Sequence, residues 1–156
     1  MKIITKIICG IILLSTLLSF TACGDKKSIS TDDFVKKMED NSYKINDKSD
    51  KYESNSDIKS VILAYNDDYQ IEFYEFSTSE IALASFKKNK DIFEGEEGST
   101  LTKNSVKIGN HGFYGCTTNG KYSCVSYIDN TMIYVKTSKE YRKEIKSIIK
   151  KLGYNM

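Results

Sequence analysis

The chain has 156 residues and a formal net charge of +2, from 23 basic and 21 acidic side chains with one His. A nucleic-acid-binding protein normally carries a clear basic excess, so this near balance argues against a nucleic-acid partner. The length fits one domain with its own core.

The first 22 residues are predicted to be a signal peptide. Lys2 and Lys6 give a basic start, and residues 7–20 form an apolar run. That run is shorter than the roughly 20 apolar residues that span a bilayer as a helix. A basic start, a short apolar middle and small residues at the end are typical of a secretory signal. Cleavage would leave 21 basic and 21 acidic side chains.

The end of this run, Phe20-Thr21-Ala22-Cys23, resembles a lipobox, the site at which bacterial prolipoproteins are lipidated and cleaved. The resemblance implies that Cys23 carries a diacylglyceryl group and becomes the first residue of the mature chain. We therefore expect a lipid-anchored protein on the extracytoplasmic face of the cell membrane, with membrane lipid as its first partner.

A short polar tether is predicted after the lipidated residue. Residues 23–30 form the anchor and its tether, and residues 31–156 form a single domain. Seven extended residues reach about 25 Å at ~3.5 Å per residue. We therefore expect the domain to lie close to the membrane.

Hydrophobic periodicity and capping signals predict the elements of the domain. Helices are expected from the cap Ser30–Asp33 onward, from the cap Ser77–Glu80 to about Phe93, and from Lys139 to Leu152. In the second cap, Ser77 and Glu80 have capping-box spacing, and Ser79 is an alternative cap. Strands are expected at residues 58–65, 69–76, 113–118, 121–128 and 131–137, and residues 43–45 and 105–108 are further candidates for a strand.

The order of these elements predicts the fold class. Asn119-Gly120 is the strongest hairpin signal, and residues 109–112 are expected to form a glycine-bracketed turn that holds His111. Helices separated by antiparallel meanders predict an α+β fold, with an antiparallel sheet of five to six strands and three helices.

Two strand stretches of the chain are similar to those of a group of small uncharacterised lipoproteins from low-GC Gram-positive bacteria. They are residues 69–76, Tyr-Gln-Ile-Glu-Phe-Tyr-Glu-Phe, and residues 118–122 through 133–135. These are strand and turn motifs, so the resemblance implies a location and a fold without assigning an activity.

Cys116 and Cys124 are the two thiols that remain after the lipidated one. With a two-residue Asn119-Gly120 turn, Cys116 is opposite Ser123, so the two thiols are predicted to lie on opposite faces of the hairpin. This register argues against a disulfide, although export permits one. A disulfide and two buried free thiols are therefore both open, and the second is favoured.

No catalytic constellation is recognised in the sequence. A nucleophile pair of Cys116 and His111 would need an activated thiolate, and a mid-strand position suits packing better. One His and separated Cys residues give no metal-ligand spacing, and no cofactor is expected. The acidic stretch 91–97 lacks the spacing of a calcium loop and is interpreted as a solvated helix end.

The last meander is predicted to be apolar on both faces. Pairing across the Asp129-Asn130 turn places Tyr127, Met132 and Tyr134 on one face, with Cys124 and other apolar residues on the opposite face. Either helices cover both sides of the sheet, or Tyr127, Tyr134 and Met132 form a partner surface.

The last helix is rich in Lys. A solvated polar face is the default interpretation, and contact with anionic lipid headgroups is the second.

We therefore expect a non-catalytic binding domain of the cell envelope, whose partner is an envelope protein, a peptide or a glycan. One alternative is an envelope hydrolase or thiol enzyme that uses Cys116 and His111. Another is a purely structural envelope protein.

Overall fold

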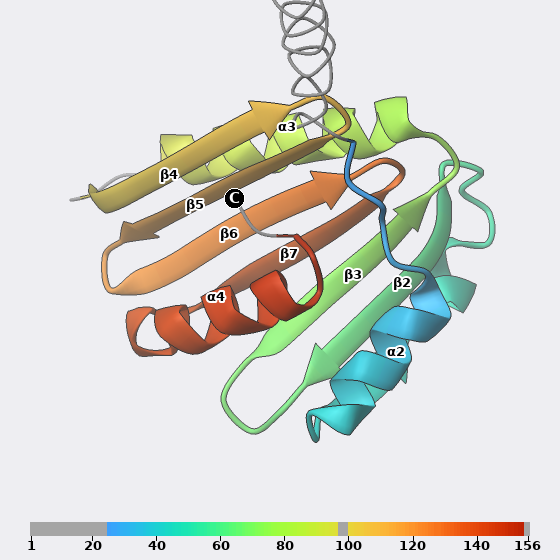
Figure 1. Cartoon of the computed structure of the whole chain (residues 1–156), viewed down its shortest axis with the longest axis horizontal. Coiled ribbons are helices and arrows are strands. Elements are labelled where there is room, and N and C mark those ends of the chain that lie inside the picture. The colour runs from blue at the N-terminus through green and yellow to red at the C-terminus, as the bar shows by residue number, and fades with distance from the viewer. Residues whose placement is uncertain (1–24, 97–99, 155–156) are drawn as a thin grey trace, which may run out of the picture.

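The computed structural model of the chain describes residues 25–96 and 100–154. Within these residues, three α-helices and seven β-strands form an α+β fold around one antiparallel sheet (Figure 1). The predicted fold class is confirmed, and the sheet is larger than the expected five to six strands. The predicted signal peptide and Cys23 lie outside the described residues. No described helix is long and apolar enough to cross a membrane.

The sheet has the strand order β1-β2-β3-β7-β6-β5-β4, and each neighbouring pair is antiparallel. Only the contact between β3 and β7 joins strands that are distant in sequence, and it unites two meanders into one sheet. The strands are β1 (Lys44–Asp47), β2 (Ile58–Tyr65), β3 (Gln70–Phe76), β4 (Thr100–Ile108), β5 (His111–Thr118), β6 (Lys121–Ile128) and β7 (Thr131–Ser138).

The region around Gly109 differs from the prediction. The expected turn over residues 109–112 is a two-residue turn, so β5 begins at His111 rather than Phe113. Strand β4 ends at Ile108 as predicted but begins earlier, at Thr100. Gly112 lies within β5, where a Cβ would come within 2.7 Å of the Tyr127 ring. Glycine is therefore needed at this position because the Tyr127 ring packs against the backbone, and not because the chain turns there. The sequence pattern does not distinguish these two roles of a glycine.

Helices cover both faces of the sheet (Figure 1). Helices α2 (Thr31–Asp40) and α4 (Arg142–Lys151) pack on one face, and α3 (Ser79–Gly95) packs on the other. The predicted cap of α2 is confirmed, because Ser30 Oγ accepts a hydrogen bond from the Asp33 amide at 3.1 Å. The cap of α3 is Thr78 rather than Ser77 or Ser79, and it accepts from the Ile81 amide.

Each face of the sheet has its own apolar core. Under α2, the rings of Phe34 and Phe73 stack with centroids 4.6 Å apart. Under α3, Phe86 contacts Tyr127 with centroids 4.9 Å apart. Because side chains alternate along each strand, the strands contribute residues to two separate hydrophobic layers.

A buried aromatic residue follows the last helix. A short 3-10 turn, η3 (Lys139–Tyr141), precedes α4, and Tyr154 beyond α4 is fully buried. Ser126 Oγ donates to the Tyr154 carbonyl at 3.0 Å, and the Tyr154 hydroxyl is hydrogen-bonded to Thr131 Oγ1. Tyr154 thus fixes the end of the chain to the middle of the sheet.

The substitution Tyr154→Ala should lower the free energy of unfolding by ~3–5 kcal/mol, because it leaves a large cavity and removes the hydrogen bond between the Tyr154 hydroxyl and Thr131. Lys150→Ala, at an exposed position of α4, should change that free energy by less than ~0.5 kcal/mol. Urea denaturation followed by circular dichroism measures both. Equal stability of the two variants would contradict the anchoring role of Tyr154.

Candidate binding groove

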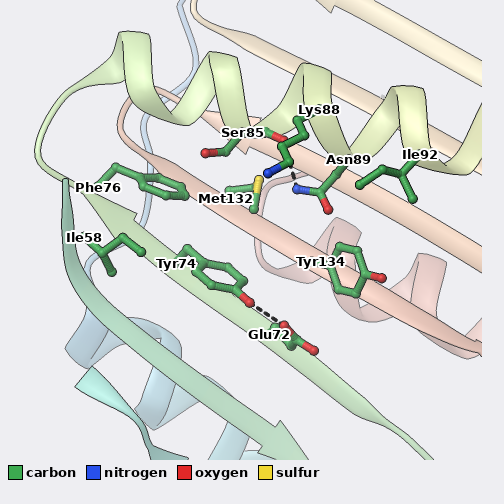
Figure 2. A pocket seen from close by; sticks show the side chains of 10 residues that line it. All are labelled: Ile58, Glu72, Tyr74, Phe76, Ser85, Lys88, Asn89, Ile92, Met132 and Tyr134. Atoms are coloured by element: carbon green, nitrogen blue, oxygen red, sulfur yellow. Dashed lines mark hydrogen bonds between the residues drawn. The ribbon is translucent and has the colours of Figure 1, made fainter. Parts of the chain in front are cut away.

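A groove of about 500 Å³ lies where α3 meets the sheet (Figure 2). Helix α3 packs mainly over β6, so the same face of β7 and β3 is only partly covered. The groove is lined by Ile58, Glu72, Tyr74, Phe76, Ser85, Lys88, Asn89, Ile92, Met132 and Tyr134.

The floor of the groove comes from β3 and β7. Side chains alternate along a strand, so Tyr74 and Phe76 share the α3 face with Met132 and Tyr134. The rings of Tyr74 and Phe76 are nearly parallel, with centroids 6.0 Å apart. Tyr134 is half-buried, and its ring packs against Phe93 of α3 at 5.3 Å. The floor is therefore made of three aromatic rings, with Met132 opposite Tyr74 on the neighbouring strand.

One wall of the groove is a single stripe of α3. Ser85, Lys88, Asn89 and Ile92 are spaced three or four residues apart, so they lie on one side of the helix. Figure 2 shows these side chains above the strand residues of the floor. Ile92 is 53% exposed, an unusual position for a large apolar side chain. This wall therefore offers an apolar contact beside an amine and an amide.

A carboxylate marks the polar end of the groove. Glu72 accepts hydrogen bonds from the Tyr74 hydroxyl and from Gln70 Nε2. Burial and the bond to Glu72 raise the pKa of Tyr74, and burial raises the pKa of Tyr134. Both hydroxyls therefore stay protonated at physiological pH.

A second hollow of about 540 Å³ lies at the other end of the sheet, beside the β2–β3 turn. It is lined largely by charged and polar side chains, including Asp67, Asp68, Lys121 and Lys136. Apart from Tyr65 and Tyr69 its lining is polar or charged, so the more apolar groove beneath α3 is the stronger candidate for a binding site.

The predicted partner surface is only partly found. Tyr127 and Met132 are each 3% exposed, because α3 covers them, and Tyr134 alone of the three is half-exposed. Helices cover both faces, which is one of the two predicted outcomes. Met132 and Tyr134 still line the groove, whereas Tyr127 lies under Phe86.

The sequence pattern does not reveal the residues of α3 that form the other half of the groove. The alternation in residues 70–76 identifies the face that carries Glu72, Tyr74 and Phe76, but not the element opposite them. The stripe on α3 that includes Ile92 is an apolar and polar mixture, which is typical of many solvated helices.

The two thiols lie where the hairpin register placed them. Cys116 pairs with Ser123 and Cys124 with Gly115, so the thiols lie in the α3 core and the α2–α4 core respectively. Both are buried and free. Burial raises the pKa of the Cys124 thiol to about 12, so this thiol is a packing group and a poor nucleophile.

The structure does not bring Cys116 and His111 together. They are five positions apart on β5, which places their side chains on opposite faces and separates them by ~16 Å along the strand. Burial and the nearby charge of Lys26 lower the pKa of His111, so its ring is neutral at pH 7. The pair therefore lacks the contact that a nucleophile and its base require.

The acidic stretch after α3 is engaged by lysines. Lys136 Nζ is 2.6 Å from Glu96 Oε1, and Lys90 Nζ is 3.9 Å from Glu94 Oε1. Glu97 lies outside the described residues. Across residues 25–96 and 100–154, no three His, Cys, Asp or Glu side chains gather closely enough to hold a metal ion.

No protein-family model and no curated protein matches the chain in sequence. Among solved structures, the chain is similar to a GTP-binding regulator from Thermotoga maritima at 15% identity and a TM-score of 0.45. The alignment covers 81% of this chain and 89% of the other. A similarity this distant carries no functional argument.

The buried thiol predicts a dependence of stability on alkaline pH. The pKa of Cys124 is raised in the folded chain from 9.0 to about 12, so folding favours the protonated thiol. The stabilisation is complete below pH 9 and is lost as the pH rises toward 12. We expect the free energy of unfolding in urea to fall by about 2 kcal/mol between pH 8.5 and 10.5 from this group alone.

The buried tyrosines add to the same trend, because burial raises the pKa values of Tyr74 and Tyr122 as well. In Cys124→Ala the loss of stability over this pH range should therefore be smaller but not absent. A free energy of unfolding that is constant, or that rises, over this range would contradict the burial of these groups.

Proposed function

We propose that the chain is a lipoprotein held through diacylglyceryl-Cys23 on the extracytoplasmic face of the cell membrane. We further propose that its domain binds a peptide segment of an envelope protein in the groove beneath α3. The anchor rests on the lipobox at Phe20–Cys23 and on the signal-like residues before it. The binding role rests on one observation, the partly uncovered aromatic groove between α3 and β3.

The composition of the groove favours a peptide over a glycan. Its lining includes Ile58, Phe76, Met132 and the exposed side chain of Ile92, which suit apolar side chains rather than sugar hydroxyls. Aromatic residues and methionine are also enriched at protein interfaces. An apolar side chain of the partner is therefore the expected anchor.

The polar groups of the groove suit the backbone of such a peptide. Glu72 supplies acceptor oxygens, and Lys88 supplies a donor that forms no ion pair with a described residue. The volume of about 500 Å³ lies within the usual range for ligand sites of ~300–1,000 Å³. A short segment with one or two apolar side chains fits these dimensions.

The anchor is tested by Cys23→Ala. Without the thiol no diacylglyceryl group can be attached, so the variant should move from the membrane fraction to the soluble or secreted fraction. Intact mass measured on the membrane-extracted wild type should show a lipid-modified chain that begins at Cys23. An unmodified chain, or membrane retention of the variant without lipid, would contradict the lipoprotein assignment.

The groove is tested with a phage-displayed peptide library and a matched pair of variants. Peptides selected on the wild type should bind Ile92→Glu at least about tenfold more weakly, a loss of ~1.4 kcal/mol, because a charge then replaces an apolar wall. Ile108→Glu is the control, since Ile108 is similarly exposed at 44% but lies outside the groove. Isothermal titration calorimetry measures each affinity.

Equal affinity of the selected peptides for both variants would place binding outside the groove. Failure to select any peptide, together with binding of purified cell-wall glycan fragments that Ile92→Glu abolishes, would replace the peptide with a glycan.

A further inference from the structure

The segment expected to be a free tether is fixed to the end of the sheet. Asn110, in the β4–β5 turn, accepts a hydrogen bond from the Lys26 amide through Oδ1 at 3.0 Å. Its Nδ2 donates to the Lys26 carbonyl at 2.7 Å and to Asp129 Oδ1 at 2.7 Å. One side-chain amide therefore pairs with both backbone groups of Lys26, as a neighbouring strand would.

The residues that follow continue this attachment. Ile29 packs against the core of the α2–α4 face, and Ser30 caps α2. In Figure 1 the segment, drawn in blue, runs from beside the β4–β5 turn to the start of α2. The residues from Lys26 to Ser30 therefore belong to the domain and do not act as a tether. The distance between the domain and Cys23 is thus shorter than the seven-residue tether would allow.

Chain length then limits the distance between the anchor and the sheet. Lys26 is three positions after Cys23, and each step along the chain covers at most ~3.6 Å. The Cα atom of Cys23 therefore lies within about 11 Å of that of Lys26. By contrast, the Asn119-Gly120 turn is at the opposite end of β5, roughly 23 Å away along the strand.

The surface beside the docked segment has the chemistry of a bilayer contact. Ile108, the last residue of β4, is 44% exposed directly before the turn that holds Lys26. Lys107 and Lys27 are exposed at the same end of the domain, and Lys26 is half-exposed beside them. The acidic residues there are Asp25 and Asp129, so the basic side chains outnumber them by one. Exposed apolar and basic groups together suit the interface of an anionic membrane.

We propose that this end of the sheet, residues 107–110 with the docked residues 25–27, rests on the membrane surface, and that Asn110 is the latch that sets this orientation. The proposal rests on the lipidation of Cys23. Its partner is a lipid bilayer with anionic headgroups.

The position of Asn110 also determines which end of the groove is nearer the membrane. Asn110 bonds to Asp129, and the next residue, Asn130, accepts from the Phe76 amide and donates to the Phe76 carbonyl. Phe76 and Ile58 form the end of the groove that lies on this side of the sheet, whereas Glu72 lies farther along β3. The apolar end of the groove is thus turned toward the bilayer, and its carboxylate end is turned away.

The test uses the full-length lipidated chain in vesicles of phosphatidylcholine and phosphatidylglycerol. An environment-sensitive fluorophore is placed at Lys107→Cys or, at the far end of the sheet, at Lys139→Cys; both positions are exposed, and Lys139 bonds to Gly120. The native thiols are buried and remain unlabelled. Nitroxide-headgroup lipids should quench the label at position 107 at least about twofold more strongly, since the two ends are ~23 Å apart.

Asn110→Ala should remove most of this difference and should accelerate hydrogen exchange at the Lys26 amide. Asn66→Ala is the matched control, because Asn66 caps the β2–β3 turn through the amides of Asp68 and Tyr69, away from the docked segment. This control should keep the wild-type quenching pattern and the slow exchange at Lys26.

Three outcomes overturn the proposal in distinguishable ways. If intact mass shows no lipid on Cys23, the proposed membrane anchor fails and the orientation fails with it. If the chain is lipidated but labels 107 and 139 are quenched equally, only the orientation fails. If the asymmetry persists in Asn110→Ala, the side-chain amide of Asn110 is not the latch.

Discussion

Burial of both faces of the central strands is the constraint on which the rest of the structure depends. Strands β3, β7 and β6 carry apolar side chains alternately on the two faces, so each face must be covered. Helices α2 and α4 cover one face, and α3 covers the other (Figure 1). The same alternation divides the two thiols and the aromatic residues between separate cores, so the two faces can differ in how completely they are closed.

The groove follows from a mismatch in width. Seven strands at ~4.8 Å spacing span about 29 Å, whereas one α-helix is ~10–12 Å across. Two helices nearly suffice for one face, but α3 alone cannot cover the other. The 3-10 turn η2 (Ser49–Tyr52) continues along the edge of β2, where Ser49 Oγ accepts from the Val61 amide at 3.1 Å. Beside α3 the side chain of Tyr74 on β3 stays half-exposed, and the partly covered strip of β3 and β7 around it is the groove.

The docking of residues 25–27 on Asn110 relates one end of the groove to the proposed membrane anchor. The hydrogen bonds from Lys26 through Asn110 and Asp129, and from the adjacent Asn130 to Phe76, link the docked segment to one end of the groove. With a lipid anchor only a few residues before Lys26, the domain would present a defined face to the bilayer. The orientation of the groove relative to the membrane would then be set by the anchor, without a conformational change.

The sequence by itself determined the elements, because their signals are local. Ser30 as a cap and the Asn119-Gly120 turn, whose two residues fix the register of β5 and β6, follow from capping and turn chemistry. That register was enough to separate Cys116 from Cys124. The resemblance of residues 20–23 to a lipobox is likewise local, and the expectation about location rests on it.

Only the tertiary structure decided which elements meet. The sequence pattern of residues 70–76 shows a two-sided strand, but the pairing of β3 with β7 and the placement of α3 depend on non-local packing. The role of Gly112 and the docking of Lys26 on Asn110 are contacts between distant segments, and a single sequence carries no local signal for them. The groove consists entirely of such contacts, which is why its residues emerged only from the folded chain.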